Sequence, residues 1–97
     1  MAEVEFTREA REQAAALPRP IGARVERLVA RLARWPAVSG AKPLSGELAG
    51  HWRMRTGDYR LQFRVQPGWP ADGERPAGPD VVIVERIGHR DGFYDDA

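Results

Sequence analysis

The residues best suited to do chemistry lie between His51 and Val65. This stretch reads HWRMRTGDYRLQFRV, in which apolar and polar side chains alternate on both sides of Gly57 and Asp58. Such alternation predicts two strands joined by a tight turn, which is a β-hairpin. Successive side chains of a strand point to opposite faces. One face of the hairpin is therefore predicted to be apolar and the other polar.

The predicted polar face is cationic or neutral along both strands. Its members are His51, Arg53, Arg55, Arg60, Gln62 and Arg64. A solvated face normally mixes both signs of charge, so this one indicates a local positive field in a chain whose formal net charge is only +1. Arginine matches phosphate through its planar fork of donors and stays charged at neutral pH. Three of the arginines, Arg53, Arg55 and Arg60, are predicted to lie close enough to surround one phosphate.

Length and composition limit the possible classes of protein. The 97 residues predict one domain, residues 1–97, with a single modest core. A net charge of +1 argues against binding nucleic acid through bulk charge, so a polyanion must be held by a local patch. Arginine supplies 14 of the 15 basic residues, which a GC-rich coding bias explains without any function.

The absence of cysteine excludes disulfides, thiolate metal sites and thiol catalysis. No run is apolar enough for a membrane span and no signal-peptide pattern is present, so a cytoplasmic location without membrane association is expected.

Regular elements are predicted on both sides of the hairpin. They are a short strand over residues 2–6, a helix over 8–17 capped by Thr7, an amphipathic helix over 21–35 after a Pro-Arg-Pro connection, and an apolar strand over 81–87 ended by Gly88. Residues 37–50 are predicted to form a loop. In the segment 66–80, seven of fifteen residues are proline or glycine, which predicts a second, long loop of undetermined role.

The order of these elements predicts an α+β fold. The two helices should form an antiparallel hairpin because their connection is short. An N-terminal strand, this helical hairpin and three further strands (β-α-α-β-β-β) give a helical layer packed on one face of a small, mostly antiparallel sheet. The cationic face then lies on the free side of the sheet, where Arg86 or Arg90 can join it from the last strand.

The stretch from Lys42 to Leu61, which reads KPLSGELAGHWRMRTGDYRL, resembles the RelE/ParE superfamily of type II toxin–antitoxin toxins. The following hydrophobic strand, the run Gly88-His89-Arg90 and Tyr94 extend this resemblance over the whole chain. It implies a toxin with a cognate antitoxin as partner. RelE-like members are ribosome-dependent endoribonucleases that cut mRNA, whereas ParE-like members inhibit DNA gyrase.

Motif positions of the RelE-like branch fall on Arg53, Arg55, Arg60, Arg90 and Tyr94. The resemblance thus implies that the arginines hold the phosphate and its transition state, while Tyr94 moves a proton or stacks on a base. The ribosome and mRNA are then partners, and His51, Arg64 and Arg86 are expected to add RNA contacts. The resemblance implies cleavage by 2′-OH attack without a metal or other cofactor, and the tail carboxylates show no ligand spacing with histidine that would indicate a metal.

The general base is left open by this pattern. Arginine cannot take a proton at pH 7, and the best-known members carry lysines on the second strand of the motif. Tyr94 is favoured, followed by His89, with His51 as a further candidate; His89 could instead orient the tail by a hydrogen bond. Two other functions stay open: a ParE-like gyrase inhibitor using the arginines as a protein-binding surface, and a non-catalytic relative that acts as a binding module.

Overall fold

The computed structural model describes residues 2–68 and 78–90 of the chain. Its elements are β1 (Glu3–Phe6), α1 (Arg8–Ala15), α2 (Arg19–Leu32), β2 (Lys42–Pro43), a 3₁₀ turn (Gly46–Leu48), β3 (His51–Thr56), β4 (Tyr59–Gln66) and β5 (Val81–His89). The strands form one sheet in the order β1-β5-β4-β3-β2. β1 runs parallel to β5, and the other three pairs are antiparallel. The predicted α+β fold with a mostly antiparallel sheet is confirmed.

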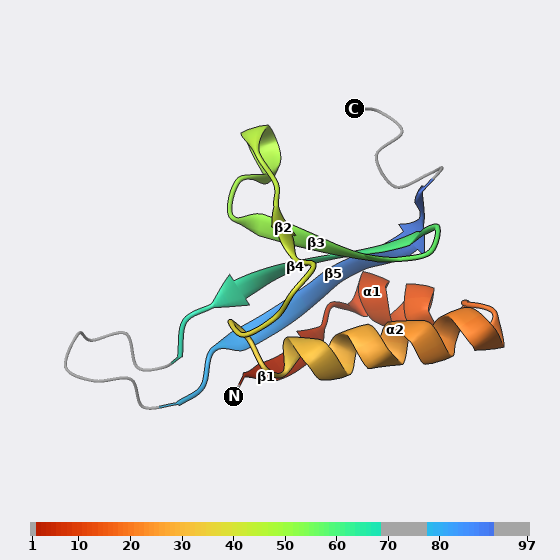
Figure 1. The fold of residues 1–97 in the computed structure, drawn as a ribbon, viewed down its shortest axis with the longest axis horizontal. Helices are drawn as coiled ribbons and strands as arrows, with labels where there is room; N and C mark the ends of the chain where they lie inside the picture. Colours follow the sequence, from red (N-terminus) through yellow and green to blue (C-terminus); the bar gives the residue numbers. More distant parts are fainter. Residues whose placement is uncertain (1, 69–77, 91–97) are drawn as a thin grey trace.

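Both helices lie on one side of the sheet (Figure 1). α1 begins after Thr7, whose Oγ1 accepts a hydrogen bond from the N–H of Ala10 at 3.1 Å and so caps the helix. α2 begins at Arg19, earlier than predicted, because Pro20 lies in its first turn rather than in the connection. Proline fits there since the N–H groups of a first helical turn have no partner within the helix. No helix in the described part of the chain is long and apolar enough to cross a bilayer.

The core lies between the helical layer and the sheet. The helices contribute Ala10, Val25, Leu28 and Leu32, and the strands contribute Met54, Leu61, Phe63, Val82, Val84 and Ile87. Trp35, just beyond α2, packs edge-on against Trp52 and Phe63 with ring centroids 5.0 and 5.5 Å apart. Because these apolar side chains all lie on the helix side, the opposite face of the sheet is available to polar groups.

The predicted hairpin is formed by β3 and β4. Its register runs from His51 opposite Arg64 to Thr56 opposite Tyr59, which leaves a two-residue turn. Gly57 occupies the first central position of this turn with φ of 60°, the positive value that a type II′ turn requires and glycine adopts without strain. The turn fixes the register, and the register fixes which side chains share a face.

Predicted boundaries on both sides of the hairpin are also wrong. The segment 37–50, predicted as a loop, contains the short strand Lys42–Pro43, which pairs with β3. β5 does not end at Gly88 but continues to His89, opposite Tyr59. A glycine weakens a strand without ending it, and here β4 continues to pair alongside. Most of the predicted loop from residue 66 to residue 80 lies outside the described residues.

Candidate functional site

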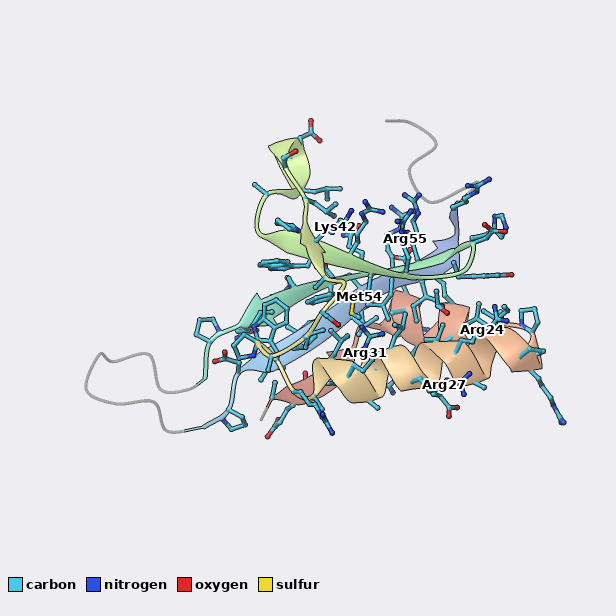
Figure 2. The ribbon with its side chains drawn as sticks, viewed as in Figure 1. Arg24, Arg27, Arg31, Lys42, Met54 and Arg55 are labelled. Atoms are coloured by element: carbon cyan, nitrogen blue, oxygen red, sulfur yellow. The ribbon has the colours of Figure 1, made fainter. Side chains whose placement is uncertain are left out.

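The side of the sheet turned away from the helices carries rows of basic side chains. Residues opposite each other in neighbouring strands point to the same face. The first row contains Lys42, Arg53, Gln62 and Arg86, the second Arg55, Arg60 and Gly88, and the third His51, Arg64 and Ile83. Figure 2 shows Lys42 and Arg55 pointing away from the helices and Met54, between two arginines of β3, pointing toward them. We call the surface formed by these three rows the arginine face.

Arg53, Arg55 and Arg60 lie together on this face, as the alternation of the hairpin predicts. Arg55 is directly opposite Arg60, and Arg53 is the next residue of β3 on the same side. A hollow of about 400 Å³ at the open edge of the sheet is lined by Gly40, Lys42, Arg53, Arg55 and Gly57. Lys42, which the sequence did not single out, therefore adds a fourth cation beside the arginines. Such a cluster of donors suits a phosphate group.

His89 and Arg90, at the end of β5, lie in different places. The N–H of Arg90 donates to the carbonyl of Asp58 at 2.8 Å, and its Nε lies 3.8 Å from the Asp58 carboxylate. Arg90 is thus held at the hairpin turn, at the same end of the sheet as Arg55 and Arg60. His89 pairs with Tyr59, and their rings meet edge-on at 5.2 Å on the helix side of the sheet. The structure therefore does not bring His89 onto the arginine face, and Tyr94 lies outside the described residues.

A carboxylate also lies on the arginine face. Oε1 of Glu85 lies 2.6 Å from His51 Nδ1 and accepts a hydrogen bond from Gln62 Nε2 at 3.2 Å. Oε2 accepts a hydrogen bond from Arg64 Nε at 3.1 Å. The side chain of Glu85 is only 19% exposed. The hairpin strands carry no acidic side chain on this face, as predicted, and β5 adds Glu85 to it.

A β-bulge explains why Glu85 escaped prediction. Val84 and Arg86 pair with consecutive residues of β4, so Glu85 is an extra residue of β5 without a direct partner. The bulge changes the alternation: Arg86 joins the polar row, and Ile87 is buried at 2% exposure on the core side. The sequence signal was the interval of three between the apolar residues Val84 and Ile87, in a strand that otherwise alternates.

The start of the helical layer supports this bulge. Thr7 donates from its backbone N–H to the carbonyl of Val84 at 2.9 Å and from Oγ1 to the carbonyl of Glu85 at 3.2 Å. Gln13 Oε1 accepts a hydrogen bond from the N–H of Ile87 at 2.7 Å. These contacts satisfy backbone groups beside the bulge, which buried peptide groups require. The helical layer thus helps to set the position of Glu85 on the opposite face.

Within 2–68 and 78–90, no group of three or more His, Asp or Glu side chains is placed to hold a metal ion.

Known proteins resemble this chain over almost its whole length. The family model described as ParE toxin of type II toxin–antitoxin system, parDE, matches residues 4–92. Toxin RelG of Mycobacterium tuberculosis is 38% identical over 92 residues, covering 94% of this chain and 93% of RelG. The toxin–antitoxin complex RelBE2 from the same organism has a chain that matches with a TM-score of 0.68 and 36% identity, covering 92% of this chain and 98% of that one. The isolated Escherichia coli RelE toxin has the same fold, with a TM-score of 0.65 and 14% identity over 92% of this chain and 84% of that one.

Proposed function

This chain belongs to the RelE/ParE superfamily of type II toxin–antitoxin toxins, and from that premise we propose that it is a ribosome-dependent endoribonuclease that cuts mRNA. The observation that carries the proposal is the grouping of Arg53, Arg55 and Arg60 on one face of the sheet. Arginine side chains gathered in this way match the geometry and charge of a phosphate group.

In the proposed reaction, the phosphorus–oxygen bonds that form and break belong to the RNA itself. The ribose 2′-oxygen attacks the adjacent phosphorus, the O2′–P bond forms, and the P–O5′ bond breaks to leave a cyclic phosphate and a 5′-hydroxyl. Negative charge grows on the phosphoryl oxygens in the transition state. Arg53, Arg55 and Arg60 balance that charge from fixed positions, which is the most effective form of electrostatic catalysis.

The remaining site residues receive roles by position and motif. Arg90, held at the hairpin turn, is proposed to contact the same phosphate from its far side. His51, Arg64 and Arg86 are proposed to contact the neighbouring part of the RNA. Tyr94 is proposed to protonate the leaving 5′-oxygen or to stack on a base, as the resemblance implies.

A cognate antitoxin is proposed as the protein partner. The structurally similar RelBE2 is a toxin–antitoxin complex at 36% identity, which supports such a partner here. An acidic segment would complement the arginine face and block access of RNA to it.

Primer extension on translated transcripts tests the nuclease proposal. Induction of the chain without antitoxin is expected to produce new 5′ ends within translated messages. Arg60→Gln should reduce their yield by about 10²–10³-fold, because one transition-state donor is lost. Arg11→Gln is the matched control, since Arg11 is an exposed arginine of α1 in the helical layer. Normal translation without new 5′ ends would contradict the proposal.

The superfamily also offers gyrase inhibition, and the matching family model carries the ParE name. Cleaved DNA–gyrase complexes would accumulate in that case, and Arg60→Gln would stay fully toxic. Normal growth on induction would instead point to a non-catalytic binding module. Either result would exclude the nuclease.

A further inference from the structure

We propose that His51 and Glu85 form the proton-accepting pair of this site, in which His51 removes the proton from the ribose 2′-OH and Glu85 holds and polarises the imidazole. The inference rests on the proposed nuclease function. It assigns the general base, the one task that the arginines cannot perform because guanidinium groups stay protonated.

The hydrogen bond between the two side chains defines the state of the imidazole. Glu85 Oε1 lies 2.6 Å from His51 Nδ1, a short distance typical of a charge-assisted bond. An ionised carboxylate only accepts hydrogen bonds, so Nδ1 carries the hydrogen. Nε2 of the neutral ring is then left with a lone pair, which is the form needed to accept a proton.

The surroundings of Glu85 fix the carboxylate in this arrangement. Arg64 Nε holds Oε2 at 3.1 Å, and Gln62 Nε2 donates to Oε1 at 3.2 Å. Partial burial favours this geometry, since the side chains of His51 and Glu85 are 25% and 19% exposed. The carboxylate thus cannot easily turn away from the ring, while the ring itself keeps some contact with solvent.

The pair also lies at a suitable place on the arginine face. His51 and Arg53 share one side of β3 and are two residues apart, which is about 6.5 Å along a strand. A phosphate held by Arg53 therefore places its neighbouring ribose within reach of the imidazole. The charged groups that face His51 are Glu85 from β5, Arg64 from β4 and Arg53 from β3. From the segment after β2, the backbone N–H of Leu44 donates to the His51 carbonyl at 2.9 Å.

The proposed step balances as a proton transfer coupled to phosphoryl transfer. The proton leaves O2′ for His51 Nε2 as the O2′–P bond forms and the P–O5′ bond breaks. The departing O5′ takes a proton from water or from Tyr94. The resulting imidazolium is stabilised by the negative charge of Glu85 and returns its proton to solvent, which restores the neutral ring.

Single-turnover cleavage of mRNA in programmed ribosome complexes tests the pair between pH 5.5 and 8.5. The wild-type rate is expected to rise with pH and then level off, because a general base accepts a proton only in its unprotonated form. His51→Ala should lower the rate by about 10²–10⁴-fold, the usual contribution of a general base. It should also abolish that pH step, and added imidazole should restore part of the rate. Glu85→Gln, which keeps the shape but removes the charge, should lower the rate at least about 10-fold.

Controls separate this inference from a structural role and from the proposed function. Glu47→Gln makes the same chemical change at an exposed site of the 3₁₀ turn and should leave the rate unchanged. Thermal unfolding checks that His51→Ala is folded, and His51→Gln serves as a second variant that retains a polar side chain. An unchanged rate in His51→Ala overturns the pair, as does a reduced rate that keeps the wild-type pH profile and is not rescued by imidazole. No cleavage by the wild type would instead overturn the nuclease function.

Discussion

Arg55 and Arg60 form a cross-strand pair of like charges, an arrangement that lowers the stability of a sheet. They lie directly opposite each other in β3 and β4, and like charges in such a pair destabilise a sheet by a fraction of a kcal/mol. Their repulsion is relieved when an anion lies between or above them. The face is thus better suited to its bound state than to its free state.

Replacing Arg55 by threonine is expected to stabilise the protein while reducing its activity. The free energy of unfolding should rise by about 0.2–1 kcal/mol at low salt, because the cross-strand repulsion is removed and threonine favours strands. Urea unfolding measures this change, and the gain should shrink as salt screens the charges. Arg55→Lys keeps the charge and should show no such gain. A less stable Arg55→Thr protein would show that Arg55 makes a favourable contact in the free toxin.

Sequence reasoning works well at this scale where alternation is regular. Apolar and polar residues alternate within each strand of the hairpin, so the residues sharing each of its faces could be predicted correctly. Glu85 could not be placed in the same way, because one extra residue in β5 changes the face of every residue after it. Its partner His51 was visible as a histidine on the polar side, but the contact joins residues 34 apart in the chain.

The bulge of β5 and the first turn of α1 depend on each other. Thr7 caps α1 through Oγ1 and uses the same hydroxyl to bond the carbonyl of Glu85, 78 residues away. One side chain thereby joins a helix terminus to β5, the strand that carries Glu85, the proposed partner of His51. Local sequence indicates the cap but not its second partner.

Replacing Thr7 by alanine is expected to weaken both elements. The free energy of unfolding should fall by about 1–2 kcal/mol, since the helix loses its cap and the bulge loses a hydrogen bond. Thermal unfolding measures the loss, with a shift of about 4–8 °C per kcal/mol for a domain of this size. Thr7→Ser retains the hydroxyl and should remain within about 0.5 kcal/mol of the wild type. Equal stability of the alanine and serine variants would contradict the role of the hydroxyl.

Element boundaries could be predicted only where local chemistry decides them. The period of 3.6 in α2 and the glycine turn of the hairpin act within a few residues, so both elements could be recognised. Lys42–Pro43 becomes a strand only because β3 lies beside it, and residues 88–89 stay in β5 because β4 continues alongside. Such boundaries depend on pairing with a neighbouring strand, which the local sequence alone does not indicate.

The small net charge of the molecule hides a local concentration of positive charge on the arginine face. The net charge is only +1, yet the arginine face carries a group of cations opposite the apolar core. Binding of a polyanion should therefore depend on this face and on its counterions, not on the overall charge.

RNA binding is expected to weaken as the salt concentration rises, by an amount that depends on how many phosphate contacts the arginine face makes. Three phosphate contacts predict a slope of about −2 in a plot of log K against log salt, from about −0.7 per contact with a single strand. Fluorescence anisotropy with a labelled RNA oligonucleotide measures this slope. Arg53→Gln should make it shallower by about 0.7, whereas Arg11→Gln changes the net charge equally and should leave the slope as it is. Equal slopes in the two variants would show that the face does not bind the RNA backbone.

The position of β5 in the sheet also affects the order in which the protein folds. It is the last strand of the sheet to be synthesised, yet it lies between β1 and β4 and pairs with both. Contacts between residues so distant in the chain form slowly, because a long loop must close first. A nascent chain whose β5 is still inside the ribosome therefore has neither the complete sheet nor the pair of His51 and Glu85. The complete sheet, and with it the contact between His51 and Glu85, is therefore expected to form only after β5 has been synthesised.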